Sequence, residues 1–169
     1  DQDSGNAVVE QAQSLDALLL GRRTYEIFAG YWPNAPEDIP FTGLLNAVPK
    51  YVATRTLGGP LPWQGSTALS GNVQHSVNEL KDRHEETHVL GSLDLAQSLL
   101  ALLLVDQFNV WLHPLLLGAG KRLFAAGTVP TALRLTESAI FPSGVLKLTY
   151  ESAGAPSYGD MAAESATIF

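Results

Sequence analysis

The segment Leu18–Glu26, LLLGRRTYE, constrains the fold more than any other part of the sequence. Its aliphatic run suits a strand that is buried on both faces, as in a parallel sheet, and Gly21 allows a tight turn into a helix. Anionic ligands bind α/β proteins beyond the carboxyl end of a strand, at a helix N-terminus. With Arg22 and Arg23 at that point, the segment predicts an α/β fold and a phosphorylated ligand. A helix capped near Thr24, with solvated arginines, is the simpler alternative.

Composition excludes several classes of protein. The 169 residues suffice for one domain with a core, and 46% hydrophobic against 16% charged residues indicates a folded globule. The net charge of −7 disfavours nucleic acid, because phosphate contacts need clustered Lys and Arg. The absence of cysteine excludes disulfides and thiolate chemistry, and it fits a cytoplasmic location. We expect no membrane span, because the longest near-apolar run, Leu99–Val105, is too short.

Strands and helices alternate through the first two thirds of the chain, and a hairpin closes it. Helices are expected at Asn6–Leu15, Arg23–Trp32, Val73–His84 and Leu93–Leu104, with a loop or short helix at Asp38–Ala47. Strands are expected at Ala17–Leu20, Lys50–Thr54, Ser66–Leu69, Thr87–Leu90, Gln107–His113, Leu133–Phe141 and Val145–Glu151. This order predicts one three-layer α/β/α domain over residues 1–152, with a mostly parallel sheet and an antiparallel C-terminal hairpin at its edge. Residues 153–169 are expected to form a loosely held tail.

Two more strand ends carry residues suited to phosphate. Thr54 and Arg55 close the second strand, and an arginine there can grip a phosphate in a bidentate way. The turn Gly91–Ser92–Leu93 joins a later strand to a helix, where a glycine lets a ligand approach the backbone. Each feature alone is compatible with an ordinary polar turn or helix start. Together they predict one anion-binding cleft, because the carboxyl ends of parallel strands meet at one edge.

A fourth motif follows the Gln107–His113 strand. His113 and Pro114 lead into a turn that contains Gly118, and then into Lys121 and Arg122. His113 either faces the ligand or is an ordinary strand-end histidine, which is the commoner situation for a lone histidine. No metal site is predicted, because the four histidines lack paired ligand spacing, and no G-x-S-x-G elbow indicates a serine hydrolase.

Four segments together carry a family resemblance: LLLGRRTYEIFAGYWP, PKYVATRTL, VLGSLDLAQSLL and VWLHPLLLGAGKRLF. Over about Asn6 to Glu151, their order and spacing resemble the dihydrofolate reductase-like family. The nearest branch is the reductase (C-terminal) domain of the riboflavin-biosynthesis deaminase-reductase, with its stand-alone bacterial relatives. The resemblance implies a dihydrofolate reductase-like fold, NADPH as cofactor and a homodimer.

The resemblance also implies roles for individual residues. Those lining the dinucleotide phosphates would be Gly21, Arg22, Arg23 and Thr24. Those near the adenosine 2′-phosphate would be Thr54 and Arg55. Those binding the pyrophosphate would be Gly91, Ser92 and Leu93. Those near the nicotinamide would be His113, Pro114 and Gly118.

The sequence departs from the family before the first helix. Members usually carry a strand and a Ser-Leu-Asp-Gly loop there, central to the sheet and lining the substrate pocket. This chain opens at Asp1, where that segment would end, so we expect either that the segment is absent from this chain or that the protein does without it. Ala166–Phe169 is an alternative strand for the same position. No catalytic residue is assigned, because the family's pocket acid comes mostly from that segment.

Two functional hypotheses follow. The first is an NADPH-dependent reductase that transfers hydride to a small conjugated C=N or C=C substrate, with the cofactor supplying the chemistry. The second is a non-catalytic or repurposed dimeric scaffold of the same fold.

Overall fold

The computed structural model describes residues 1–158, so the expected Ala166–Phe169 strand lies outside the described residues. The helices are α1 (Gln2–Ala12), α2 (Arg22–Tyr31), the 3-10 turn η1 (Trp32–Asn34), α3 (Thr42–Ala47), α4 (Val73–Arg83) and α5 (Leu93–Ala101). The strands are β1 (Ala17–Gly21), β2 (Lys50–Ala53), β3 (Ser66–Leu69), β4 (Thr87–Val89), β5 (Gln107–Leu112), β6 (Leu133–Ile140) and β7 (Leu146–Ser152). The predicted order is therefore confirmed, with shifted ends.

Helix α1 begins four residues before the expected Asn6. Asp1 caps the helix, because its carboxylate accepts a 2.7 Å hydrogen bond from the Ser4 N–H. The Ser4 side chain lies against the backbone of Asp1 in return, which forms a capping box. The cap satisfies an N–H group that would otherwise lack a partner, and so stabilises the first turn.

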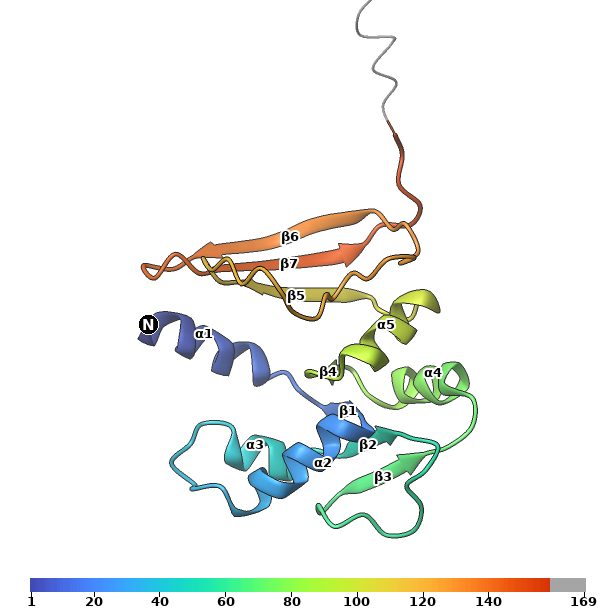
Figure 1. The fold of residues 1–169 in the computed structure, drawn as a ribbon. Coiled ribbons are helices and arrows are strands. Elements are labelled where there is room, and N and C mark those ends of the chain that lie inside the picture. The colour runs from blue at the N-terminus through green and yellow to red at the C-terminus, as the bar shows by residue number, and fades with distance from the viewer. Residues whose placement is uncertain (159–169) are drawn as a thin grey trace, which may run out of the picture.

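Four parallel strands form the first sheet, in the order β3-β2-β1-β4. Residues 17–20 of β1 are all buried, as expected for a central strand that is covered on both faces. Leu18 and Leu20 pack with Tyr25 and Trp63 on the face that α2 and α3 cover. Leu19 packs with α4 and α5 on the other face. The predicted α/β/α layering is thus present, with the strands in the middle layer (Figure 1).

The remaining three strands form a separate antiparallel sheet, in the order β5-β7-β6. The sequence pattern placed the closing hairpin at the edge of a single sheet, whereas the structure pairs it with β5 and leaves β4 as an edge of the parallel sheet. Helix α1 lies under one face of the antiparallel sheet (Figure 1). Trp111 Nε1 donates to Gln11 Oε1 at 3.1 Å, and the Ser143 N–H donates to the Asp1 carboxylate at 2.8 Å. These contacts anchor the helix to that sheet.

Among residues 1–158, no helix has the length and apolar character needed to cross a membrane.

Candidate functional site

The first turns of α2 and α5 are joined by hydrogen bonds between distant parts of the chain. The Gly21 N–H donates to Ser92 Oγ at 2.9 Å, and the Ser92 N–H donates to Thr24 Oγ1 at 3.0 Å. Ser92 Oγ also donates to the Leu90 carbonyl at 3.3 Å. The structure therefore brings together two of the strand ends that the sequence singled out, those of β1 and β4.

The turn before α5 has an unusual backbone. Gly91 and Ser92 have φ values of 59° and 54°, the left-handed region that favours glycine. A Cβ added at Gly91 would lie 3.3 Å from Thr24 Cγ2, so a side chain there would press on the start of α2. The glycine thus lets the two helix starts approach each other closely. Leu93 follows as the first residue of α5.

Neither helix start is capped by a side chain. Gly21 precedes α2 and Ser92 precedes α5, and neither makes a side-chain cap hydrogen bond. The first-turn N–H groups of a helix lack partners within it and carry a partial positive charge. Two such helix starts at one sheet edge can bind an anion with two phosphate groups.

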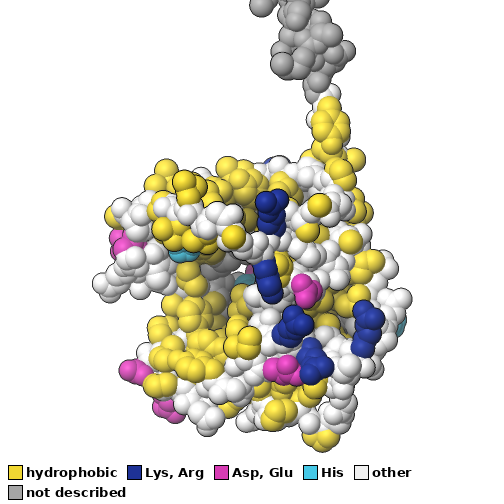
Figure 2. Space-filling model, viewed as in Figure 1, with side chains coloured by type: hydrophobic (Ala, Val, Ile, Leu, Met, Phe, Trp, Pro, Cys, Tyr) yellow, Lys and Arg dark blue, Asp and Glu magenta, His cyan; other side chains and the backbone are white. Residues whose placement is uncertain are grey.

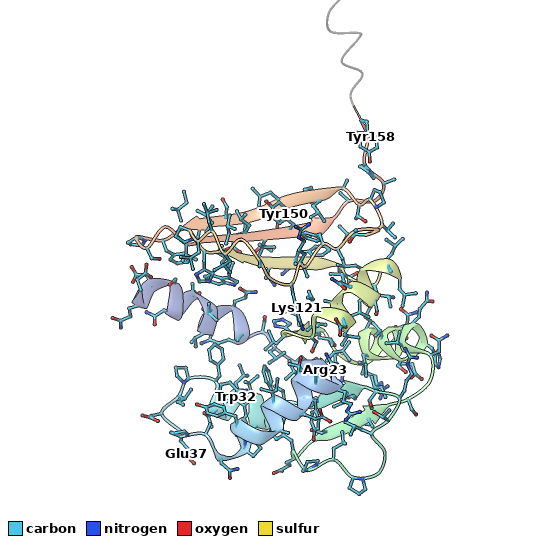
Figure 3. All side chains as sticks on the ribbon, in the orientation of Figure 1. Arg23, Trp32, Glu37, Lys121, Tyr150 and Tyr158 are labelled. Atoms are coloured by element: carbon cyan, nitrogen blue, oxygen red, sulfur yellow. The ribbon has the colours of Figure 1, made fainter. Side chains whose placement is uncertain are left out.

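Basic side chains lie on the same side of the molecule. Arg22 is held by Glu26, with Nε 2.7 Å from Oε1, and donates to Thr56 Oγ1 at 2.8 Å. Among residues 1–158, Arg23 makes no side-chain hydrogen bond or ion pair. Figure 2 shows a line of Lys and Arg side chains down this face, and Figure 3 shows Lys121 above Arg23 in it. In a chain with a net charge of −7, this line concentrates positive charge on one face.

The segment that carries Lys121 is tied to α5. Gln97 Nε2 donates to the carbonyl of Arg122 at 2.8 Å, one turn into the helix that begins at Leu93. The connection between β5 and β6 therefore comes beside the helix start that Gly91 and Ser92 form. From the sequence alone, Lys121 and Arg122 were identified only as basic residues that follow a glycine-containing turn, and their position beside α5 was not predicted.

Thr54 and Arg55 differ in their surroundings. Thr54 is buried, and its Oγ1 accepts the N–H groups of Thr56 and Leu57 at 3.2 and 3.0 Å. Its hydroxyl oxygen thus shapes the turn after β2. Arg55 is exposed, and no ion pair involves it within the described part of the chain.

His113, Pro114 and Gly118 lie after the end of β5. Pro114 packs beside the turn of the β6–β7 hairpin, where a Cβ added at Gly144 would lie 3.4 Å from Pro114 Cγ. Within residues 1–158, no hydrogen bond joins these three residues to the Gly21–Ser92 cluster. Their predicted place near a nicotinamide therefore stays a prediction.

A groove of about 470 Å³ separates the two sheets. Three parts of the chain line it: α1 with the residues after it, β4 with the residue before it, and the antiparallel sheet. The lining residues are Glu10, Gln11, Ser14, Glu86, His88, Gln107, Asn109, Thr136, Glu137, Lys147 and Thr149. Figure 2 shows a hollow between the antiparallel sheet and the rest of the molecule. The sequence analysis missed this groove, although polar residues that interrupt apolar strands, such as His88 and Asn109, were a signal.

Two pairs of polar side chains face each other in the groove. His88 Nε2 lies 3.0 Å from Glu86 Oε2, and Lys147 Nζ donates to Glu137 Oε1 at 3.0 Å. Hydrogen bonds from Ser14 and His88 lower the pKa of Glu86 below its ordinary value. The groove therefore holds an ionised carboxylate at neutral pH.

The fold, a parallel α/β sheet with a separate three-stranded antiparallel sheet, is shared with solved structures of RibD-like proteins. Residues 2–147 match the model of the RibD C-terminal domain family, and the chain belongs to that family. The curated relative YyaP of Bacillus subtilis (strain 168), an uncharacterized protein, is 28% identical over 140 residues, which are 80% of this chain and 73% of YyaP.

Solved structures agree on the fold. A protein assigned to riboflavin biosynthesis in Shewanella sp. PV-4 aligns with a TM-score of 0.69 at 19% identity, covering 86% of this chain and 78% of that one. A pyrimidine reductase-like protein of Corynebacterium diphtheriae aligns at 0.60 and 14%, covering 90% and 82%. RibD of Acinetobacter baumannii aligns at 0.64 and 13%, covering 90% of this chain but only 51% of RibD.

Proposed function

We propose that the protein is an NADPH-dependent reductase that transfers hydride to a small conjugated C=N or C=C substrate. The observation that carries the proposal is the joining of two uncapped helix starts by the Gly21–Ser92 and Ser92–Thr24 hydrogen bonds. Membership of the RibD C-terminal domain family and the reductase-like relatives support it.

The residues present fit the phosphates of a dinucleotide. Gly91 is exposed, so the backbone of the turn is accessible to a pyrophosphate. Gly21, Arg22, Arg23 and Thr24 would hold one side of it, and Gly91, Ser92 and Leu93 the other. Arg55 would pair with the adenosine 2′-phosphate. When bound, NADPH supplies the hydride, while these residues bind and orient it.

We place the substrate beside the groove between β4 and β5. Within residues 1–158 these two strands are sheet edges that line the groove, and exposed edges tend to pair with another strand. A strand of the kind that the family carries before its first helix would pair with both edges and join the two sheets. Its loop would then complete the substrate pocket.

The alternative is a repurposed, non-catalytic scaffold that keeps the nucleotide site. The paired side chains that occupy the groove favour it, since Glu86 lies against His88 and Glu137 against Lys147 there. In either case we propose a homodimer located in the cytoplasm.

Fluorescence titration of the chain with NADPH, followed by measurement of nicotinamide oxidation with small imines and enones, tests the proposal. Binding with oxidation supports the reductase, and binding without oxidation supports the scaffold. The variant Arg23→Gln should weaken NADPH binding about tenfold, as expected for the loss of one charge-assisted contact. The matched variant Arg83→Gln, in α4 and paired with Glu79, should leave it unchanged. No binding to the wild-type chain would refute the cofactor assignment.

A further inference from the structure

The connection between β2 and β3, residues 54–65, carries the two residues assigned to the adenosine 2′-phosphate, Thr54 and Arg55. Residues 54–65 contain no helix or strand, so their position depends on side-chain contacts. At the near end, Arg22 of α2 donates to Thr56 Oγ1 at 2.8 Å. The start of α2 and the start of this connection therefore lie side by side, and the position of Arg55 depends on how the connection is held.

The far end of the connection is anchored at Trp63, which is 2% exposed. The Trp63 N–H donates to the Tyr25 hydroxyl at 3.2 Å, and Trp63 Nε1 donates to Asn46 Oδ1 at 2.7 Å. Asn46 is fixed in turn, because its Nδ2 donates to the Trp32 carbonyl at 2.9 Å. Both N–H groups of Trp63 are thus bonded, one to α2 through Tyr25 and one to α3 through Asn46.

Tyr25 links this anchor to the cofactor-binding end of α2. It lies one turn into the helix, which begins at Arg22. Its hydroxyl therefore joins the helix start that carries Arg22 and Arg23 to the connection that carries Arg55. Because Tyr25 is buried, removal of its hydroxyl would leave the Trp63 N–H without an acceptor in a place that water does not reach.

Between its two ends the connection is not tightly packed against the rest of the molecule. A hollow of about 310 Å³ lies between α2 and the connection, with Ala29 and Gly30 on one side and Leu57 and Leu61 on the other. Close packing is what holds a segment in place in a protein interior, and a hollow removes those contacts. The ends of the connection, and the Trp63 anchor in particular, therefore fix its position more than its middle does.

We propose that Tyr25 is a positioning residue for the 2′-phosphate of NADPH. Its hydroxyl holds Trp63, and through Trp63 the connection, so that Arg55 stands at a fixed distance from the start of α2. This role rests on the proposed function, because it concerns the same cofactor site. Since the 2′-phosphate is the only difference between NADPH and NADH, the buried hydroxyl should influence the choice between these two cofactors. A hydroxyl that served stability alone would leave that choice unchanged.

Fluorescence titration of Tyr25→Phe with NADPH and with NADH tests the proposal. The variant keeps the ring and removes the hydroxyl. The Kd for NADPH should rise about fivefold, as expected when a charge-assisted contact is displaced but not deleted, and the Kd for NADH should not change.

The matched control is Tyr51→Phe. Tyr51 lies in β2 on the face that α4 covers, and its hydroxyl is 2.9 Å from His84 Nε2. This variant also loses one hydroxyl hydrogen bond of the core, but away from the connection, so both Kd values should stay as in the wild type. Urea unfolding of the two variants establishes that each is folded during the titrations.

Two further measurements show whether the hydroxyl acts through the connection. In the double variant Tyr25→Phe, Arg55→Gln, the first substitution should add nothing to the loss caused by the second, because Tyr25 acts through Arg55. In the chain without cofactor, amide hydrogen exchange of residues 55–63 should be about tenfold faster in Tyr25→Phe than in the wild type. Asn46→Ala, which removes the other acceptor of Trp63, should show the same selective loss of NADPH affinity.

The outcomes separate this role from the proposed function. An unchanged Kd for NADPH in Tyr25→Phe, equal weakening of NADPH and NADH, additive losses in the double variant, or unchanged exchange of residues 55–63 each overturn the positioning role while NADPH binding by the wild type stands. A wild type that does not bind NADPH overturns both the cofactor assignment and the positioning role.

Discussion

Gly21 and Ser92, 71 residues apart in the sequence, are joined by a 2.9 Å hydrogen bond from the Gly21 N–H to the serine hydroxyl. The bond connects the end of β1 to the turn that starts α5. Because Ser92 also donates its N–H to Thr24, the serine fixes the distance between the starts of α2 and α5. The geometry of the proposed phosphate site therefore depends on two hydroxyl side chains, those of Ser92 and Thr24.

Replacing Ser92 by alanine should destabilise the protein. The part-buried Gly21 N–H would lose its acceptor, which costs about 1–3 kcal/mol. Urea unfolding measures the change. Ser98→Ala is the matched control on α5, since that exposed hydroxyl bonds only to the Asp94 carbonyl within the helix, and we expect less than about 0.5 kcal/mol. Equal losses in the two variants would show that the interhelical bond is unimportant.

Gly91→Ala should destabilise the turn by about 1–3 kcal/mol, because alanine is strained at φ 59° and its Cβ would press on Thr24 Cγ2. Adding Thr24→Ser should restore part of the stability, since serine lacks that methyl group and keeps the hydroxyl. Gly30→Ala, in the last turn of α2 with nothing near its Cβ, should instead stabilise by about 0.5–1 kcal/mol. Thermal unfolding compares the four proteins, and a neutral Gly91→Ala would contradict the strain.

Lys50 should make the free energy of unfolding change with pH in the alkaline range. Its side chain is fully buried at the start of β2, where Nζ donates to the carbonyls of Asn46 and Gln64 at 2.8 and 3.0 Å and lies 4.5 Å from the Trp63 ring centroid. Burial lowers the pKa of Lys50 from 10.5 to about 8. Above pH 8 the folded chain thus releases a proton that the unfolded chain retains up to about pH 10.5.

Folding stability at this site should therefore rise with pH between those two values, by up to about 2 kcal/mol at pH 9.5. The free energy of unfolding in urea at pH 7.5 and 9.5 measures the rise. Lys50→Met has no titrating group at the position, so the wild type should gain stability relative to this variant as pH increases. Parallel pH dependence in the two proteins would rule out a buried lysine with a lowered pKa.

Arg55 should select NADPH over NADH. It is exposed at the end of β2 and has no ion-pair partner among the described residues, so it is available to a 2′-phosphate. Arg55→Gln should raise the Kd for NADPH about tenfold and leave the Kd for NADH unchanged. Fluorescence titration with both cofactors provides the measurement. Equal weakening of both would place Arg55 elsewhere in the site.

Much of the fold was predictable because its signals are local. The apolar run of β1, the glycine after it and the helical spacing of Val77 and Leu80 indicate their elements without reference to the rest of the chain. The division into two sheets was not predictable in this way. In strand β5, QFNVWL, polar and apolar residues alternate at first, and nothing in these six residues specifies β7 as the partner strand.

The candidate site shows the same division. Residue types at three strand ends predicted a phosphate cleft, and the starts of α2 and α5 do meet. Local sequence did not indicate that the Thr54 hydroxyl oxygen accepts two N–H groups of its own turn. It also did not indicate the groove, whose lining comes from α1, β4 and the antiparallel sheet.

The sequence by itself determined the order of the elements, the buried strand LLLG and the residue types at its end, since these depend on periodicity and on backbone preferences within a few residues. Only the tertiary structure decided that Ser92 bonds to Gly21 and that β5 pairs with β7 in a separate sheet. It also decided that the leucines that follow β5 are exposed. Those outcomes depend on which distant segments pack together, and the free energy of such packing belongs to pairs of segments and not to either one alone.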